Sequence, residues 1–309
     1  MSALQITAIL GSLASSVAAH GYVSGFVAGG TWYSGYSPSF QYQNPPPTVA
    51  GWSDPENLAN GYVAPTAYGD ADIVCHLSAT PGGTAAQIKA GDQVELQWTT
   101  WPDSHHGPVL DYLAKVDGEF ADIDKTALNF FKIDERGLVD SSAAPGKWAS
   151  DELIANNNSW AVTIPSSIAP GKYVLRHEII ALHSAGDANG AQNYPQCINL
   201  EITSDGTDTP AGQVATSFYK AEDPGIKINI YNPLASYTIP GPALWSAAAP
   251  VNQIPAAISS SVPLASSGSA AASSYMPAST TASASSLSIH TSYSNTTYSA
   301  TAYPSSAPA

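Results

Sequence analysis

The chain has 309 residues, of which 11% are charged, and its formal net charge is −14. An acidic chain of this kind is repelled by nucleic acids and by anionic membrane surfaces, so neither is expected as a partner. A neutral polysaccharide raises no such electrostatic barrier.

Residues 1–19 are predicted to be a secretory signal peptide. They carry no charged side chain, and an apolar stretch leads to the small residues Val17 and Ala19. Signal peptidase prefers small residues at these two places, so cleavage is expected before His20. The apolar run is short and is broken by glycine and serine, which disfavours a membrane anchor. The sequence therefore predicts a secreted, extracellular protein whose mature chain begins at His20.

Residues 20–245 are predicted to form one domain made of β-strands. Glycine and proline separate the candidate strands, and long loops rich in proline and tyrosine intervene. Short strands at this spacing favour an all-β fold, an antiparallel β-sandwich of the immunoglobulin or fibronectin-III type with few short helices. A short helix near residues 126–132 or 148–155 fits this class. The candidate strands are residues 93–98, 109–116, 160–164, 172–183 and 197–203.

Residues 246–309 have a different composition. They consist mainly of Ser, Ala, Thr and Pro, and no charged residue follows Lys227. Too few large apolar side chains remain to offset the loss of chain entropy on folding. We therefore predict a disordered, O-glycosylated tail.

Two kinds of covalent modification are expected in a secretory compartment. Cys75 and Cys197 are the only cysteines, and they are expected to form a disulfide. The alternative is a pair of free buried thiols. Sequons at Asn157 and Asn295 are candidate N-glycosylation sites.

A histidine at the mature N-terminus offers an unusual set of metal donors. The α-amine of His20 titrates at about 7.7–8.0, so it deprotonates readily, and together with the ring it can close a chelate on one ion. One further imidazole would complete a set of three nitrogens, which suits copper. The alternative is a solvent-exposed histidine without a function.

Two other segments contain candidate metal-site residues. His105 and His106 lie on a loop between two predicted strands, and loops carry function more often than strands do. Gln192 and Tyr194 are two residues apart, so in an extended chain they project to the same side. Tyr194 could be a weak axial ligand, or it could pack in the core with its hydroxyl hydrogen-bonded.

Hydrolase signatures are not evident. The chain lacks the G-x-S-x-G and H-E-x-x-H motifs and any glycine-rich phosphate loop. Its carboxylates are scattered, and no pair stands out as the acid and base of a glycoside hydrolase.

Taken together, these residues resemble the fungal lytic polysaccharide monooxygenases of auxiliary activity family nine, formerly glycoside hydrolase family sixty-one. The resemblance rests on the processed His20 and on residues 104–109 and 191–197, which occur in the family's order. It implies one copper ion per chain, bound by the amine and ring of His20 and by His105, with Tyr194 as axial ligand. His106 is then a neighbour and not a ligand.

The resemblance also assigns roles to residues around the metal. It implies that His183 and Gln192 are catalytic residues that hydrogen-bond the oxygen co-substrate, as groups behind metal ligands often tune reactivity. It further implies that Cys75 and Cys197 form the family's principal disulfide.

The implied reaction is oxidative degradation of a polysaccharide. An external electron donor reduces copper, O2 or H2O2 is the co-substrate, and oxidation at C1 and/or C4 breaks the glycosidic bond of cellulose or a related β-1,4-glucan. The enzyme is expected to act as a monomer. Tyr231 and Tyr42 are candidates for stacking on sugar rings, with ordinary loop packing as the alternative.

Other functions stay open on the sequence alone. One is a secreted copper-binding or carbohydrate-binding β-sandwich protein without oxidative activity, which copper titration and product analysis would distinguish. Another is a hydrolase, which would release unoxidised products without a reductant.

Overall fold

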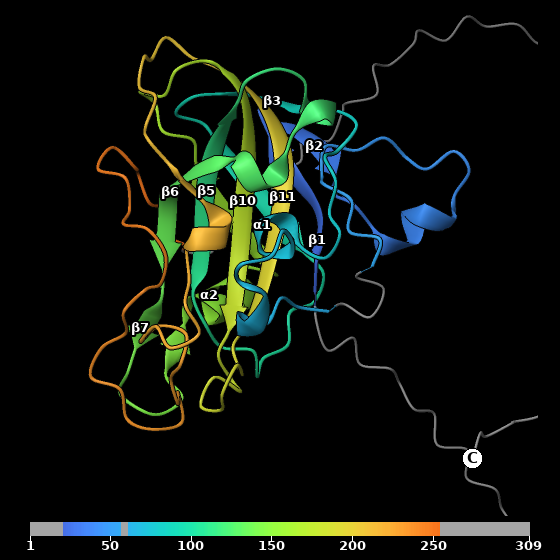
Figure 1. Ribbon diagram of the computed structural model, residues 1–309. Helices are drawn as coiled ribbons and strands as arrows, with labels where there is room; N and C mark the ends of the chain where they lie inside the picture. Colours follow the sequence, from blue (N-terminus) through green and yellow to red (C-terminus); the bar gives the residue numbers. More distant parts are fainter. Residues whose placement is uncertain (1–20, 57–60, 254–309) are drawn as a thin grey trace, which may run out of the picture. The chain divides into compact units, whose positions relative to one another are not determined.

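Two β-sheets face each other in the computed structural model, which describes residues 21–56 and 61–253 (Figure 1). One sheet has four strands in the order β2-β1-β4-β9, and the other has six in the order β12-β6-β5-β10-β11-β3. Strands β7 and β8 form a separate small ladder. Most neighbouring strands run antiparallel, and β3 pairs with β11 in parallel. The predicted antiparallel sandwich is confirmed.

The strands, in chain order, are β1 (Val23–Ala28), β2 (Thr31–Ser34), β3 (Ala86–Lys89), β4 (Gln93–Trp98), β5 (Val109–Val116), β6 (Asn129–Arg136), β7 (Leu138–Asp140), β8 (Lys147–Trp148), β9 (Ser159–Thr163), β10 (Gly171–Ala181), β11 (Gln192–Thr203) and β12 (Gln213–Val214). The α-helices are α1 (Asp72–Cys75) and α2 (Ala149–Ala155). The 3-10 turns include η1 (Pro38–Tyr42), η3 (Pro65–Ala67), η4 (Phe120–Asp122), η5 (Lys125–Ala127) and η6 (Ala215–Ser217).

The predicted strands agree with the structure. Strands β4 and β5 have the predicted bounds, and β11 begins five residues earlier than predicted. Of the two segments that could hold a short helix, residues 148–155 contain α2. Residues 126–132 contain a 3-10 turn followed by the start of strand β6. Phe130 and Phe131 point to opposite faces of the sheet, and both are buried.

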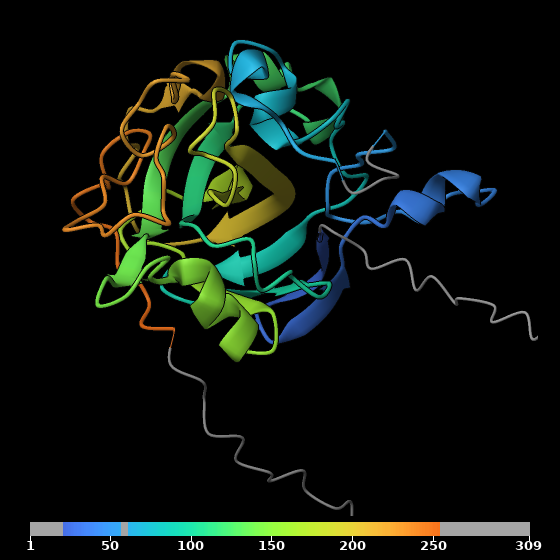
Figure 2. The same ribbon diagram turned by 90° about the horizontal axis from the view of Figure 1, so that it is seen from below.

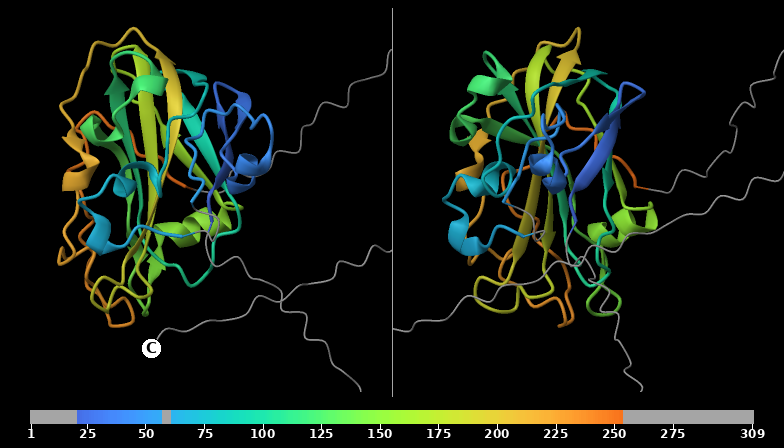
Figure 3. Two further views of the ribbon diagram at one scale, coloured as in Figure 1. Left: turned by 45° about the vertical axis from the view of Figure 1, so that its right-hand side comes forward. Right: turned by 90° about the vertical axis from the view of Figure 1, so that its right-hand side faces the viewer.

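The six-stranded sheet is buried on both faces. One face packs against the four-stranded sheet, where Leu96 and Trp160 meet Leu113 and Leu175. The other face is covered by α1 and by the long segment after β12, which wraps over it (Figure 3). Because both faces are covered, β5 and β10 are nearly continuous buried runs.

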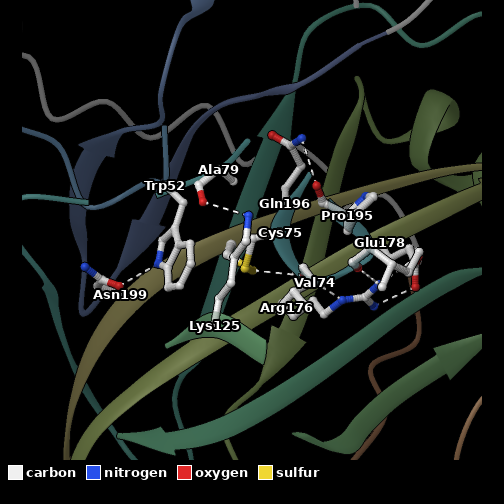
Figure 4. The surroundings of a disulfide bond; sticks show 12 residues. Trp52, Val74, Cys75, Ala79, Lys125, Arg176, Glu178, Pro195, Gln196 and Asn199 are labelled. Carbon is white, nitrogen blue, oxygen red and sulfur yellow. Dashed lines mark hydrogen bonds and ion pairs between the residues drawn. A yellow bond between two sulfur atoms is a disulfide. The ribbon is translucent and has the colours of Figure 1, made fainter. Parts of the chain in front are cut away.

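Helix α1 is fixed to the six-stranded sheet in two ways. Cys75 at its end forms a disulfide with Cys197 on β11, with the Cα atoms 5.2 Å apart, as the sequence predicts. The guanidinium of Arg176 on β10 donates to the carbonyl of Val74, at 2.8 Å (Figure 4). It also pairs with Glu178 at 2.6 Å, and both side chains are fully buried. These contacts fix α1 in position against β10 and β11.

The described chain continues past residue 245 as far as Gln253. The side-chain amide of Gln253 bonds twice to the backbone of Ala161 on edge strand β9, at 3.1 and 2.7 Å. Asn156 Nδ2 donates to the carbonyl of Gln253. Residues 1–19 and 254–309 lie outside the described part, so the signal peptide, the tail and the domain boundary at residue 245 stay predictions. Within the described part, no helix has the length and apolar character needed to span a membrane.

Candidate active site

Three segments that are distant in sequence meet at one end of the sandwich. Val23 at the start of β1 pairs with Trp98 at the end of β4. The β4–β5 loop returns at Val109, which pairs with Ile179 near the end of β10. The β10–β11 loop returns at Gln192, the first residue of β11. The start of the chain after His20, residues 99–108 and residues 182–191 therefore lie at the same end, which Figure 2 views directly.

The loop that carries His105 is held on both sides by backbone hydrogen bonds. Leu182 N donates to the carbonyl of His106 at 2.8 Å, and Ser150 N donates to the carbonyl of Gly107 at 3.1 Å. A Cβ atom on Gly107 would lie 1.8 Å from the carbonyl oxygen of Ile180. Only glycine allows this approach, so the His-Gly-Pro part of the motif has a packing reason.

The ring of His105 lies next to a second imidazole. His105 is 8% exposed, and its Nδ1 is 3.1 Å from the hydroxyl oxygen of Ser104. The ring of His183, which follows β10, has its centroid 4.1 Å from that of His105. The Trp101 and His105 rings form an edge-to-face pair with centroids 5.8 Å apart. The structure thus brings together two histidines that are 78 residues apart in the chain.

Tyr194 and Gln192 lie on the same side of β11, as predicted. The Tyr194 hydroxyl donates to Gln192 Oε1 at 2.8 Å, and its ring meets Trp101 at 5.0 Å between centroids. Burial raises the pKa of Tyr194 well above its ordinary value, and the neighbouring Tyr62 raises it further. The phenol therefore keeps its proton at neutral pH. Trp101 contacts both Tyr194 and His105, so it joins the two parts of the site.

The chain next to His20 is held against this cluster. Tyr22 N donates to Thr99 Oγ1 at 3.1 Å, and Thr99 N donates to the carbonyl of Tyr22 at 2.9 Å. A Cβ on Gly21 would lie 3.0 Å from Thr99 Oγ1 and 3.4 Å from the Trp101 ring. His20 itself lies outside the described residues. Its neighbour Gly21 nevertheless packs on the tryptophan that contacts His105.

His106 makes a different contact from His105. Its Nδ1 lies 2.9 Å from the carboxylate of Asp151, which also accepts the backbone N–H of Trp148 at the start of α2. His106 is thus engaged with helix α2.

Exposed tyrosines lie in several of the long loops. Tyr42 and Tyr231, which the sequence predicts as substrate contacts, are 72% and 56% exposed. Sequence reasoning missed Tyr62, which is 39% exposed and has its ring 6.2 Å from that of Tyr194. Its position beside the site depends on the bridge between Val63 and Asn193, which local sequence does not reveal. The candidate glycosylation site Asn157 is exposed, and Asn295 lies outside the described residues.

Metal ligands in the described part of the chain do not form a complete site by themselves. Among residues 21–56 and 61–253, no group of three His, Cys, Asp or Glu side chains is placed to hold a metal. The donors that do gather are the imidazoles of His105 and His183 and the phenol of Tyr194. The imidazole nitrogen of His105 suits copper, so the site fits that metal once further nitrogens are added.

Comparison with known proteins decides the family. The sequence profile of auxiliary activity family 9, formerly GH61, matches residues 20–238. The chain belongs to auxiliary activity family 9. It is 62% identical over 243 residues to AA9 family lytic polysaccharide monooxygenase A of Malbranchea cinnamomea, covering 78% of this chain and 72% of that protein. It is 58% identical over 255 residues to monooxygenase I of Botryotinia fuckeliana, covering 82% and 94%.

Solved structures of the family share its fold. The extended catalytic domain of H. jecorina LPMO9A matches with a TM-score of 0.71 and 52% identity, over 74% of this chain and 91% of that one. Cel61B of Hypocrea jecorina matches with a TM-score of 0.69 and 43% identity, over 73% and 100%. The family membership and the enzyme class expected from the sequence, a lytic polysaccharide monooxygenase, are confirmed.

Proposed function

We propose that the mature chain is a secreted, copper-dependent lytic polysaccharide monooxygenase that oxidises cellulose or a related β-1,4-glucan at C1, at C4 or at both. The observation that carries this proposal is the convergence of His105, His183 and the Tyr194–Gln192 pair at the end of the sandwich where Gly21 is held. This arrangement supports a metal site completed by the residue before Gly21.

The residues that would hold copper are His20 through its amine and ring, His105 through Nε2, and Tyr194 through its phenol oxygen. Nδ1 of His105 is engaged with Ser104, which favours Nε2 as the ligand atom. A protonated phenol is a weak donor, so Tyr194 would bind the metal more weakly than the nitrogen ligands do. When bound, copper supplies one-electron chemistry that links an external reductant to O2 or H2O2.

The residues around these ligands have separate tasks. Ser104 orients the His105 ring, as groups behind metal ligands commonly do. His183, whose ring lies beside that of His105, is the proposed proton donor or acceptor for the oxygen co-substrate. Gln192 is oriented by the Tyr194 hydroxyl, and its amide nitrogen has two N–H donors for hydrogen bonding.

The proposed substrate contacts are Tyr42, Tyr62 and Tyr231. Each side chain is exposed, and an aromatic ring offers an apolar face that can stack on a glucose ring. A neutral glucan is also compatible with the net charge of −14.

Secretion is part of the same proposal. The α-amine of His20 is a ligand only after residues 1–19 are removed. A chain that keeps even one residue before His20 is therefore expected to lose copper-dependent activity.

Product analysis tests the proposal. The mature protein is incubated with cellulose and ascorbate, with and without copper, and the soluble products are identified by mass spectrometry. We expect aldonic acids or C4 gem-diols that require reductant, an oxygen co-substrate and copper, and their ratio measures the C1 and C4 preference. Unoxidised oligosaccharides formed without reductant would show a hydrolase instead.

Two adjacent histidines provide a matched pair of variants. His105→Ala should abolish copper-dependent oxidation, whereas His106→Ala should retain most of it, because His106 is engaged with Asp151. Full activity of His105→Ala would overturn the ligand assignment.

A further inference from the structure

A buried hydrogen-bonded chain crosses the space between the two sheets. The indole Nε1–H of Trp98 on β4 donates to His177 Nε2 at 2.8 Å. On its other side, His177 Nδ1 lies 2.7 Å from Asp111 Oδ1 on β5. All three side chains are buried. None of them is needed by the proposed metal site.

The donor and acceptor groups of Trp98, His177 and Asp111 determine where the protons lie in this hydrogen-bonded chain. An indole N–H can only donate, so His177 Nε2 accepts and carries no hydrogen. The hydrogen of the neutral ring is then on Nδ1, which donates to Asp111. The second carboxylate oxygen of Asp111 accepts from Trp160 Nε1 at 3.1 Å. His177 is therefore a neutral base held between an indole and a carboxylate.

A second carboxyl group lies near this hydrogen-bonded chain. Burial raises the pKa of Asp134 on β6, and the neighbouring Asp111 raises it further, so Asp134 favours its neutral form. A buried carboxylate beside His177 would compensate a positive charge on that ring.

Trp98 differs from the other buried tryptophans in its hydrogen-bond partner. Trp101 and Trp148 donate to backbone carbonyls, and Trp52 donates to the amide oxygen of Asn199. Trp160 donates to a carboxylate oxygen of Asp111. Carbonyl and amide oxygens do not take a proton near neutral pH, and a carboxylate is a much weaker base than an imidazole. The partner of Trp98 is an imidazole nitrogen, which can.

Ring contacts connect Trp98 to the proposed metal site. Its centroid lies 5.2 Å from that of Trp101. Trp101 in turn lies 5.8 Å from His105 and 5.0 Å from Tyr194. An electron can therefore pass from Trp98 to the site through rings that touch.

We propose that Trp98 is a redox-active residue and that His177 is its proton acceptor. A one-electron oxidant takes one electron from the indole, and the Nε1 proton moves to His177 Nε2. The products are a neutral tryptophanyl radical, an imidazolium bound to Asp111 and the reduced oxidant. An electron from an external reductant and return of the proton restore Trp98. In the enzyme the oxidising equivalent would come from O2 or H2O2 reacting at the bound metal, and this part alone rests on the proposed function.

The chemistry can be tested without copper or polysaccharide. The full mature chain is freed of metal and oxidised by a ruthenium(III) complex generated by a laser flash. The Trp32→Phe background is used because Trp32 is 57% exposed and would react first. Transient absorption and electron paramagnetic resonance then distinguish a neutral tryptophanyl radical from a protonated one. We expect the neutral form, with its signal lost in Trp98→Phe.

Two variants separate proton acceptance from hydrogen bonding. In His177→Gln, an amide can still accept the indole N–H but cannot take its proton, so the neutral radical should be lost. Trp52→Phe removes a buried indole bound to an amide oxygen outside this network and should keep the signal. An unchanged signal in Trp98→Phe, or a full yield of neutral radical in His177→Gln, would overturn the proposal.

One further measurement keeps His177 in place, so its result does not depend on whether the His177 and Trp98 variants fold correctly. In the Trp32→Phe protein labelled with ¹⁵N-histidine, the trapped radical should show a hyperfine coupling to a histidine nitrogen. Absence of that coupling would also overturn the assignment. Because no metal takes part, this result is independent of whether the proposed copper function holds.

Discussion

At the scale of single residues, Gly107 is a position where the site tolerates little change. A Cβ there would lie 1.8 Å from the carbonyl oxygen of Ile180, so Gly107→Ala must displace the loop that carries His105. We expect a loss of about 1–3 kcal/mol in unfolding free energy, the usual cost of overpacking, together with weaker copper binding. Chemical denaturation and copper titration measure the two effects.

A glycine in open space provides the control for this change. Nothing lies within 4 Å of a Cβ built on Gly69, so Gly69→Ala should change the unfolding free energy by less than about 0.5 kcal/mol. Equal losses in both variants would contradict the packing argument for Gly107.

Asp134 should make stability depend on pH. Burial raises its pKa in the folded state above the ordinary value near 4, and Asp111 raises it further. The folded protein therefore holds a proton that the unfolded chain has released, and stability falls as pH rises from about 4 to the raised value. Asp134→Asn, which is always neutral, should flatten this fall and be more stable at neutral pH. Urea denaturation across pH measures both slopes.

An exposed carboxyl serves as the comparison for Asp134. Asp70 is exposed, so Asp70→Asn should leave the pH dependence of the parent protein in place. If Asp134→Asn shows the same slope as the parent, Asp134 is ionised in the folded state and the direction given above is wrong.

Some residues of the site can be identified from the sequence, and others cannot. His105 and the Gln192–Tyr194 pair are found because the loop and the two-residue spacing are local features. His177 and Asp111 are not found, because they lie in nearly continuous buried strands where periodicity does not distinguish the faces. Tyr62 is missed because its neighbour on β11 is distant in the sequence.

At the scale of elements, the six-stranded sheet is covered on both faces, and this explains why strand β5 could be predicted from the sequence and strand β6 could not. Strand β5 is a run of β-formers, so its bounds can be predicted despite the absence of alternation. Strand β6 contains Lys132 and Asp134, which interrupt the apolar pattern, and it is not among the strands predicted from the sequence. Lys132 is nevertheless buried, and its amine donates to the carbonyl of Pro240 at 2.9 Å. That contact needs a segment more than a hundred residues away.

The disulfide between α1 and β11 is expected to contribute strongly to stability. It closes a sequence separation of 122 residues, for which loop-closure entropy predicts about 5 kcal/mol. The double variant Cys75→Ala/Cys197→Ala should lose unfolding free energy of this order, measured by guanidinium denaturation. The parent protein measured under reducing conditions is the control. A loss below about 1 kcal/mol would show that α1 is held by packing and by Arg176 alone.

At the scale of the whole molecule, Gln253 should limit how far the chain can be shortened. Its two bonds to Ala161 cover part of the exposed edge of β9. Gln253→Ala, or removal of residues 246–309, should lower the unfolding free energy by about 1–3 kcal/mol, the sum expected for two hydrogen bonds. Removal of residues 254–309 alone is the control and should leave it unchanged. Equal losses for both truncations would contradict this role.

The fold class follows from the sequence more readily than the strand order does. Short strands separated by glycine and proline predict a sandwich. The parallel pairing of β3 with β11 joins residues more than a hundred positions apart, and no local pattern encodes it. No local pattern encodes the position of the segment after β12 either. It covers the second face of the six-stranded sheet, but its composition is typical of a loop.

The unequal covering of the two sheets has a consequence for engineering. Strands β5 and β10, next to the site, are almost entirely buried, so a saturation mutagenesis library there should yield few active clones. The four-stranded sheet instead exposes Gln93 and Glu95 on its outer side. We expect these positions to accept dyes, tethers or immobilisation handles, because a change there alters neither the core nor the end that carries the histidines.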